Sequence, residues 1–353
     1  MDTIDGVFST KEWNTYLDEN PHATVYHTLE WRSILEDVFH YKTSYTVCRN
    51  GRADVVGILP IALVRSWMTG NRAVSLPFSQ YGGPLANDST ALEHLLKYLR
   101  KHLKDGFEYV RLRARDRLDD NVVARVGMRL SEDCSRCYIP LGNRTVDDIQ
   151  KSLHSGCRRA IKQSSRYNVH VRVSDEWDDL NRVNHLIVQT CKKHGTPPYP
   201  SSLLKAISDL LVPRGIAKIF IATLEQKIIG TLVLLTMKNE ATYAYVFTDP
   251  KYLRLRTNNA LLWTAIRWSL ESGMSCFDMG ISSPLDNELL RFKKSWGATE
   301  EKLHDYFILE GQKPLNPDRR SSLTYKLAIL TWRLVFPTFV ASKVGPRLLY
   351  HFG

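Results

Sequence analysis

The spacing of apolar positions predicts strands that alternate with helices along most of the chain. Residues 45–49 and 55–64 have the composition of strands, and the Asn50-Gly51 pair between them predicts a hairpin turn. Residues 219–223 and 228–237 form a second predicted hairpin, and helical spacing follows each hairpin, at 92–103 and at 258–272. Hairpins combined with alternating helices predict an α/β (α+β) fold with mixed sheets.

The same order of elements occurs twice. The first series begins at Val55-Val56-Gly57 and closes on Val126-Gly127-Met128 and Tyr138-Ile139-Pro140-Leu141. The second begins at Ile228-Ile229-Gly230 and closes on Trp296-Gly297-Ala298 and Tyr306-Phe307-Ile308-Leu309. Chance similarity is the alternative, but the matching order favours a duplicated unit, with domains at 1–141 and 142–311. A tandem pair implies a cleft between or within the units, where a ligand binds.

Residues 312–353 form a basic C-terminal tail. They hold seven lysines and arginines against Asp318 alone, which is more than half of the net charge of +11. Leucines at 323, 327, 330 and 334 predict an amphipathic helix over 323–336, too short to span a bilayer but suited to its interface. The tail therefore predicts an anionic partner, lipid headgroups or nucleic acid, with a solvated tail or a helix docked on the core as alternatives.

The bulk composition describes a globular protein of two domains. The chain has 353 residues, of which 43% are hydrophobic and 24% charged. The first residues lack the pattern of a secretion signal, so the six cysteines predict a reducing, cytoplasmic compartment. Cys134-x-x-Cys137 and His154-x-x-Cys157 resemble zinc-ligand spacing, but they lie in a predicted alternating strand and a basic helix, so we expect no metal.

Few residues carry a local signal for catalysis. Nucleophile-elbow, phosphate-loop and dinucleotide-binding motifs are absent from the sequence. Asp278 ends a predicted strand, and Phe292-Lys293-Lys294 follows it in a predicted helix. A lysine held beside a reacting carbonyl stabilises the developing oxyanion, and a carboxylate at a strand end is placed to accept a proton. A surface lysine pair is the plainer interpretation of the same residues.

Four motifs together resemble the Fem-type peptidyltransferases of the GNAT acyltransferase superfamily. They are Gln80-Tyr81-Gly82-Gly83-Pro84-Leu85-Ala86, Gly195-Thr196-Pro197-Pro198, Phe277-Asp278-Met279-Gly280 and Phe292-Lys293-Lys294-Ser295-Trp296-Gly297-Ala298. Their order and spacing resemble most closely the FemAB-like subgroup associated with exopolysaccharide and PEP-CTERM systems. The resemblance covers nearly the whole chain.

This resemblance implies two tandem GNAT-like domains that move an acyl or aminoacyl group onto an amine. The donor would be acyl-CoA or aminoacyl-tRNA, used as a co-substrate rather than as a bound cofactor. The acceptor would be a cell-envelope precursor or an amino sugar of a polysaccharide, at the inner face of the membrane, with lipid contact through residues 323–336.

The resemblance also suggests roles for particular residues. Lys293 matches the lysine of the Fem Phe-Lys motif and is assigned to the oxyanion, with Asp278 as the base. The expected substrate-binding residues are Tyr81, Arg158, Arg159, Tyr245, Ser283 and Phe292.

One stretch departs from the GNAT pattern. Coenzyme-A-binding GNAT domains have a glycine-rich loop before a helix, whereas residues 254–260 here read Arg-Leu-Arg-Thr-Asn-Asn-Ala. Arg256, Asn258 and Asn259 are the expected donor-binding residues, because the N–H groups at a helix start still bind phosphate. The missing glycines favour aminoacyl-tRNA without excluding acyl-CoA. An RNA-binding module and a catalytically inactive membrane-surface scaffold are the rival classes of function.

Overall fold

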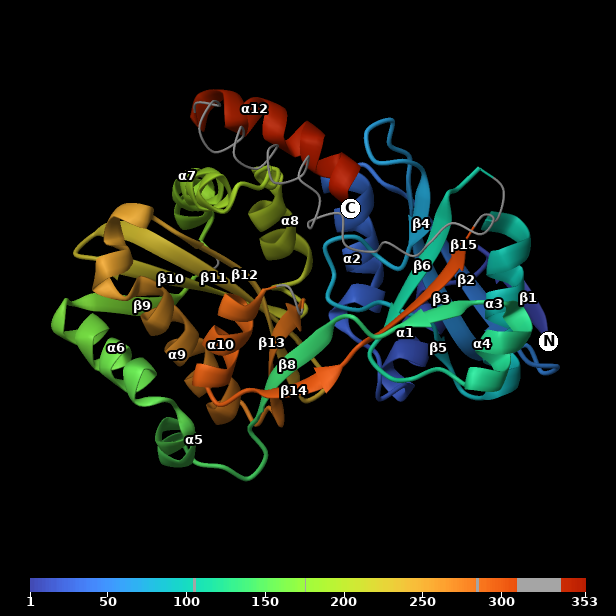
Figure 1. Cartoon of the computed structure of the whole chain (residues 1–353), viewed down its shortest axis with the longest axis horizontal. Helices are drawn as coiled ribbons and strands as arrows, with labels where there is room; N and C mark the ends of the chain where they lie inside the picture. The colour runs from blue at the N-terminus through green and yellow to red at the C-terminus, as the bar shows by residue number, and fades with distance from the viewer. Residues whose placement is uncertain (104–105, 175, 284–285, 310–337) are drawn as a thin grey trace. The chain divides into compact units, whose positions relative to one another are not determined.

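The structure is a computed structural model that describes residues 1–103, 106–174, 176–283, 286–309 and 338–353 (Figure 1). Each of two compact units has its own mixed sheet. Among the described residues, the first unit comprises 1–135, 302–309 and 350–353, and the second comprises 136–301 and 338–349. The expected α/β (α+β) class with two mixed sheets is confirmed.

The sheet of the first unit follows the order β1-β2-β3-β4-β6-β15-β7, with β5 paired to β3. The predicted hairpin of β2 and β3 is antiparallel and turns over residues 50–53, with the positive φ at Ala53 rather than at Gly51. Strands β4 and β6 are parallel. The strands are β1 (Asp2–Asp5), β2 (Lys42–Arg49), β3 (Val55–Val64), β4 (Arg72–Val74), β5 (Leu85–Ala86), β6 (Tyr109–Ala114), β7 (Arg129–Ser131) and β15 (His304–Leu309).

Local capping explains where the first helix begins. Ser9 accepts a hydrogen bond from the backbone N–H of Glu12, whose carboxylate accepts one from the N–H of Ser9. α3 packs its apolar face on β2 and β3. The helices of this unit are α1 (Thr10–Glu19), η1 (Val25–His27), α2 (Leu29–Ser33), the π-helix η2 (Ile34–Val38), α3 (Ser89–Leu103) and α4 (Asp120–Val126), followed by η5 (Tyr350–Phe352) from the end of the sequence.

The sheet of the second unit follows the order β14-β8-β13-β12-β11-β10-β9. β9 to β12 are antiparallel neighbours, and β12 and β13 are parallel. β11 is buried over almost its whole length because both faces of the sheet are covered. The strands are β8 (Ser135–Pro140), β9 (Val169–Val173), β10 (Ala217–Leu224), β11 (Lys227–Met237), β12 (Glu240–Thr248), β13 (Cys276–Ser282) and β14 (Thr299–Lys302).

Helices cover both faces of this second sheet. α9 packs on β9 to β12 with α6 beside it, while α7 packs on β11 and β12 from the other face (Figure 1). The helices are α5 (Val146–Ser152), α6 (Ser155–Arg166), α7 (Trp177–His194), α8 (Ser202–Leu210), η3 (Pro250–Leu255), α9 (Thr257–Glu271), α10 (Asn287–Ser295) and α12 (Thr338–Leu349).

The two closing strands differ from the expected arrangement. The strand expected to close domain 1–141 lies in the sheet of the second unit, and the strand expected to close domain 142–311 lies in the sheet of the first unit. Strand β8, which includes Tyr138, lies in the second sheet next to β13, and β15, which includes Tyr306, lies in the first sheet between β6 and β7. The repeated sequence pattern identified both strands correctly but could not identify their partners. Pairing between strands is decided by contacts that are distant in sequence.

One further detail differs from the sequence pattern. The segment around the basic helix predicted at His154 and Cys157 forms two helices, α5 and α6, separated at Leu153 and His154. The His154 side chain accepts from the Gly156 N–H and so starts a new helix. The predicted helix over 323–336 lies outside the described residues.

Candidate functional site

The N-terminus of α9 is the first candidate binding feature of the second unit. Strand β12 ends at Thr248, η3 follows, and Arg256 immediately precedes the helix with a φ of 62°. The helix start has no side-chain cap hydrogen bond. Its first N–H groups therefore present a positive end to a ligand, and Arg256, although not a glycine, adopts the left-handed conformation that this turn requires.

The helix start also lies close to the sheet. A Cβ atom at Gly230 of β11 would lie 2.9 Å from Thr257 Cγ2 and 3.0 Å from Leu261 Cδ1, so this glycine permits the close approach. Arg256 Nε donates to Gln163 Oε1 of α6 at 2.9 Å. The structure thus gathers the three expected donor-binding residues, Arg256, Asn258 and Asn259, at one helix end.

Strands β12 and β13 separate beside this helix start. Their parallel pairing covers only residues 240–242 of β12 and 276–278 of β13. Strand β12 is irregular at Ala244, which the register with β11 skips between Tyr243 and Tyr245. A bulge bends a strand and redirects its side chains, so the later residues of β12 diverge from β13.

Tyr245 follows the bulge and lies in an aromatic cluster. Its ring centroid is 5.2 Å from that of Tyr199, from the loop between α7 and α8, and 6.2 Å from that of Phe247. Burial raises the pKa of Tyr245 well above its ordinary value. The hydroxyl is therefore neutral at physiological pH, and the assignment of Tyr245 to an acceptor groove stays a prediction.

Asp278 lies at the centre of a buried polar cluster in β13. Its side chain is 0% exposed; Oδ1 accepts from the Gly280 N–H at 2.6 Å and Oδ2 from Arg136 Nε at 3.1 Å. Burial raises the pKa of Asp278 to about 7, while the Gly280 N–H and the Lys293 ammonium favour the ionised form. The Arg136 guanidinium also favours ionisation because it carries an opposite charge within contact distance. A carboxyl with a pKa near neutrality suits proton transfer.

Lys293 approaches this cluster from α10. Its side chain is buried, and its ammonium donates to the carbonyl oxygens of Gly280 at 2.8 Å and Ile281 at 2.7 Å. Burial lowers its pKa, opposed by the Cys137 thiol and by Asp278. Two of its three N–H donors thus hold the end of β13, and an oxyanion would take the third. The plainer interpretation of a surface lysine pair is wrong for Lys293.

The other expected substrate-binding residues of the second unit are distributed around this cluster. Ser283 is buried directly after β13, whereas Phe292 is partly exposed on α10 and lies against Trp296. Arg158 and Arg159 are exposed on α6, and Arg158 Nη1 donates to the carbonyl oxygens of Lys151 and Leu153 at the end of α5. No described contact links these arginines to Asp278, and their roles stay predictions.

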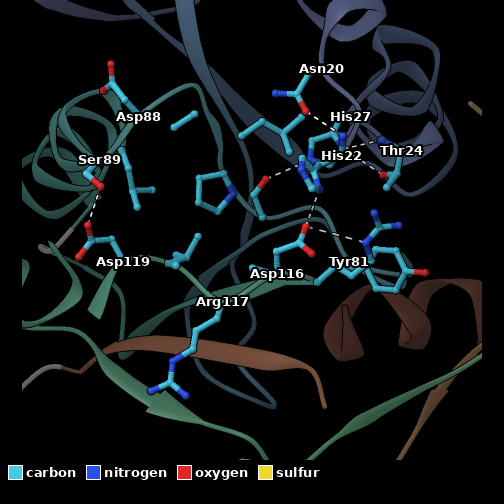
Figure 2. Close-up of a pocket in the computed structure, with 18 residues that line it drawn as sticks. Asn20, His22, Thr24, His27, Tyr81, Asp88, Ser89, Asp116, Arg117 and Asp119 are labelled. Carbon is cyan, nitrogen blue, oxygen red and sulfur yellow. Dashed lines mark hydrogen bonds and ion pairs between the residues drawn. The ribbon is translucent and has the colours of Figure 1, made fainter. Parts of the chain in front are cut away.

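Tyr81, by contrast, belongs to the first unit. It lines a pocket of about 270 Å³ together with His27, Asp116 and Arg117 (Figure 2). Figure 2 shows His22 and Asp116 facing each other, and His22 Nδ1 lies 2.8 Å from Asp116 Oδ2. The pocket surrounds the start of α3 and the end of β6, which correspond in order along the chain to the start of α9 and the end of β13.

Sequence reasoning missed two residues that the structure places in these sites. Arg136 of β8 is buried and contacts Asp278, Glu240 and the partly exposed Glu301. A charged residue inside an otherwise apolar strand was a signal, but its partners lie more than 100 positions away. His27 is a buried residue in the wall of the first unit's pocket, and nothing in its sequence surroundings marked it.

The cysteines have separate surroundings. Cys137 lies 3.6 Å from Ser282 Oγ and Cys157 lies 3.2 Å from Ser295 Oγ, measured from their sulfur atoms, while Cys134 is contacted by Arg113. Within the described parts of the chain, no group of three or more histidines, cysteines, aspartates or glutamates is arranged to hold a metal ion.

Comparisons with known proteins identify the class of domain. Residues 151–294, which include α9, Asp278 and Lys293, match the family model for the acetyltransferase (GNAT) domain. The comparison with curated proteins gave no match. The chain therefore contains a GNAT acyltransferase domain.

Solved structures define the architecture more closely. FemX superposes with a TM-score of 0.68 at 12% identity, over 88% of this chain and 98% of that one. L-PGS from Bacillus licheniformis gives a TM-score of 0.59 at 13% identity, over 93% and 97%. The tandem GNAT protein of the clavulanic acid biosynthesis pathway gives 0.55 at 12% identity, over 89% and 100%. The fold is that of the Fem-type tandem GNAT proteins.

Proposed function

We propose that the protein transfers an acyl or aminoacyl group to an amine of a cell-envelope precursor or of an amino sugar in a polysaccharide. The observation that carries this proposal is the uncapped start of α9 beside the separating strands β12 and β13, within the segment that matches the GNAT family model. The donor is acyl-CoA or aminoacyl-tRNA, and the reaction takes place in the cytoplasm at the inner face of the membrane.

Donor binding follows from the charge of the helix start. Both candidate donors carry phosphates, which the N–H groups of a helix N-terminus and an adjacent guanidinium bind well. Arg256 supplies that guanidinium, and Asn258 and Asn259 lie in the first helical turn. GNAT domains use acyl-CoA, while the likeness to lysylphosphatidylglycerol synthetases supports an aminoacyl group.

The transfer itself is an attack of the acceptor amine on the donor carbonyl. A carbon–nitrogen bond forms, the thioester or ester bond breaks, and the proton lost by the amine is accepted by Asp278 and passed to the leaving sulfur or oxygen. The Lys293 ammonium stabilises the oxyanion of the tetrahedral intermediate. Tyr245, Ser283 and Phe292 contact the acceptor in the second unit, and Arg158 and Arg159 bind phosphates of either substrate. Tyr81 belongs to the separate pocket of the first unit, and its role in acceptor binding stays a prediction.

Thermal unfolding with and without acetyl-CoA tests the donor site. A ligand at about 100 times its dissociation constant stabilises the folded protein by roughly 2.7 kcal/mol, which raises the midpoint measurably. We expect Arg256→Glu to abolish that rise. Arg267→Glu, farther along the exposed face of α9, should retain it and serves as the matched control.

The outcomes separate the two donors. If acetyl-CoA raises the unfolding midpoint and Arg256→Glu removes this rise, acyl-CoA binds at the start of α9. If acetyl-CoA has no effect and charged tRNA produces the rise instead, the donor is aminoacyl-tRNA. If neither ligand stabilises the protein and no donor gives transfer to an amine, the proposed function is wrong and an inactive scaffold becomes the better explanation.

A further inference from the structure

Strand β6 has arginines on the face of the first sheet that is turned away from the apolar core. Side chains alternate along a strand, so Val110 and Leu112 lie in the core with α3 and α4, whereas Tyr109, Arg111 and Arg113 lie on the opposite, partly exposed face. In the sheet, β6 lies between β4 and β15 (Figure 1). Residues of these two neighbours therefore contribute to the same face.

Strand pairing adds two charged residues to this face. Arg72 of β4 is paired with Tyr109, and Asp305 of β15 is paired with Arg113, and directly paired residues point to the same side of a sheet. Apart from a histidine, the charged residues of β4, β6 and β15 are three arginines and one aspartate, with a net charge of +2. We name Arg72, Arg111, Arg113 and Asp305 the arginine face.

Two of the three arginines have oxygen acceptors within the first unit. Arg113 forms a bidentate pair with Asp305, with Nε donating to Oδ1 at 2.7 Å and Nη2 to Oδ2 at 2.6 Å. Arg72 donates to the Gly353 carbonyl oxygen through Nε at 2.9 Å and to that of His351 through Nη2 at 2.8 Å. Both guanidinium groups are therefore held in fixed directions.

Arg111 lies between these two groups and differs from them. It is only partly exposed, and among the described residues its guanidinium forms no hydrogen bond and no ion pair. Burial lowers the pKa of Arg111, and the charges of Arg113 and Arg72 act in the same direction, opposed by Asp305. An arginine nevertheless stays protonated, so a charged group is left here without an acceptor, which is unfavourable unless a ligand supplies one.

The charge and the donors of this face fit a small anion with more than one negative charge. Guanidinium groups bind phosphate through paired hydrogen bonds, and a net charge of +2 suits a phosphate dianion better than a single carboxylate. The nearby carboxylates of the described chain are engaged elsewhere, because Asp305 is paired with Arg113 and Glu108 lies against Gly70 in the turn between β3 and β4. The acceptor must therefore come from a bound molecule.

We propose that Arg111 binds a phosphate group on the arginine face of the first unit, carried by a phosphate monoester or as the free anion. Two N–H groups of Arg111 donate to two phosphate oxygens, while Arg113 and Arg72 keep their own acceptors and add their positive charge. This site is separate from the start of α9, which belongs to the second unit, so the proposal does not depend on the proposed transfer function.

Thermal unfolding of full-length Arg256→Glu tests the site, because this change removes the guanidinium at the start of α9. Midpoints are measured in chloride and then with inorganic phosphate or glycerol 3-phosphate at equal ionic strength. We expect phosphate to raise the midpoint, and the added change Arg111→Gln to weaken phosphate binding at least about tenfold, because paired hydrogen bonds to a charged group are lost. Arg52→Gln, at an exposed arginine of the turn between β2 and β3, is the control and should leave phosphate binding unchanged.

Each outcome has a definite meaning. A larger rise with glycerol 3-phosphate identifies an ester as the ligand and a larger rise with inorganic phosphate identifies the free anion, and either supports the proposal if Arg111→Gln removes it. A rise that persists in Arg111→Gln overturns the proposal, and so does a midpoint that neither phosphate raises.

Two measurements guard against loss of folding. In chloride alone, Arg111→Gln should not lower the midpoint, because it removes a charge that has no acceptor in the described chain. Arg111→Lys keeps the charge but not the paired hydrogen bonds, so it should also weaken phosphate binding and provides the test if Arg111→Gln does not fold. Arg111→Lys that binds phosphate as tightly as Arg111 does would contradict bidentate binding and overturn the proposal.

Discussion

Lys293 and Lys294 are adjacent in sequence but have opposite surroundings. Lys293 is buried against two carbonyl oxygens, whereas Lys294 is exposed and pairs with Glu300. Replacing Lys293 by alanine leaves the carbonyls of Gly280 and Ile281 without this donor, so we expect the free energy of unfolding to fall by about 1–3 kcal/mol. Lys294→Ala should change it by less than about 0.5 kcal/mol.

The transfer rate distinguishes a purely structural role for Lys293 from a catalytic one. An oxyanion donor contributes roughly 100- to 1,000-fold to the rate, so single-turnover transfer by folded Lys293→Ala should fall by that factor. Lys294→Ala is the control. If the transfer rate of Lys293→Ala is within twofold of the wild-type rate, Lys293 has only a structural role, which is to hold the end of β13.

The ionisation of Asp278 predicts a pH dependence of the reaction. A base must be ionised, and with a pKa of about 7 for Asp278 the value of kcat/KM should rise with pH up to about that point and then level off. Since the folded pKa exceeds the unfolded value, the same group lowers the free energy of unfolding as pH rises from about 4 to about 7. In Arg136→Gln the rise of kcat/KM should occur at higher pH, because loss of the neighbouring guanidinium raises the pKa of Asp278. If kcat/KM rises with pH in the same way in Asp278→Asn, the assignment of Asp278 as the base is contradicted.

His27 predicts a pH dependence of stability with the opposite sign. Its Nδ1 accepts from the Thr24 N–H, so the proton lies on Nε2 and donates to the Gly83 carbonyl oxygen at 3.0 Å. Burial lowers the pKa of His27 to about 4, below its value in the unfolded chain. The stability that neutral His27 contributes is therefore fully present above about pH 6.5 and is lost as pH falls through about 4. Urea unfolding at pH 7 and pH 5 should show a loss of about 2 kcal/mol that is missing in His27→Gln. The exposed His22→Gln should behave like the wild type.

At the scale of elements, the packing of α9 on β11 depends on Gly230. A methyl group there meets Thr257, Leu261 and Thr248 at 2.9–3.0 Å. Gly230→Ala should therefore lower the free energy of unfolding by about 1–3 kcal/mol and also weaken donor binding, since it displaces the helix start. Gly51→Ala, at a turn with nothing within 4 Å, is the control and should cost about 1 kcal/mol at most. Equal unfolding midpoints for the two variants would contradict the close packing.

Elements with strong local signals were predictable from the sequence. The predicted hairpins at residues 45–64 and 219–237 correspond to β2–β3 and β10–β11, and the predicted helices at 92–103 and 258–272 correspond to α3 and α9. Strand β9 and helix α8 were missed, because β9 is short and α8 directly follows a proline-rich loop. Of the candidate site, Asp278 and Lys293 were identified through motifs, but Arg136 and His27 were not.

At the scale of the molecule, the exchanged strands predict that the first unit depends on the second half of the chain. β15 lies inside the first sheet, so a fragment of residues 1–141 would leave the edges of β6 and β7 unpaired. We expect that fragment to lack a cooperative unfolding transition. A fragment in which a flexible linker joins residue 135 to residues 302–309 should regain one, as measured by circular dichroism. Cooperative unfolding of 1–141 alone would contradict this dependence.

The membrane question also belongs to this scale. Among the described residues, no helix is long and apolar enough to cross a bilayer.

The sequence alone determined the periodicity of the elements, their caps, the duplicated order and the family resemblance, because these depend on residues close together in the chain. Only the tertiary structure decided which sheet each closing strand joins, which charge contacts Asp278 and which tryptophan remains in solvent. These features depend on pairs of residues that are distant in sequence, such as Arg136 with Asp278 and Arg72 with Gly353. Burial and strand pairing bring such residues together, and neither is encoded in a local pattern of apolar and polar positions.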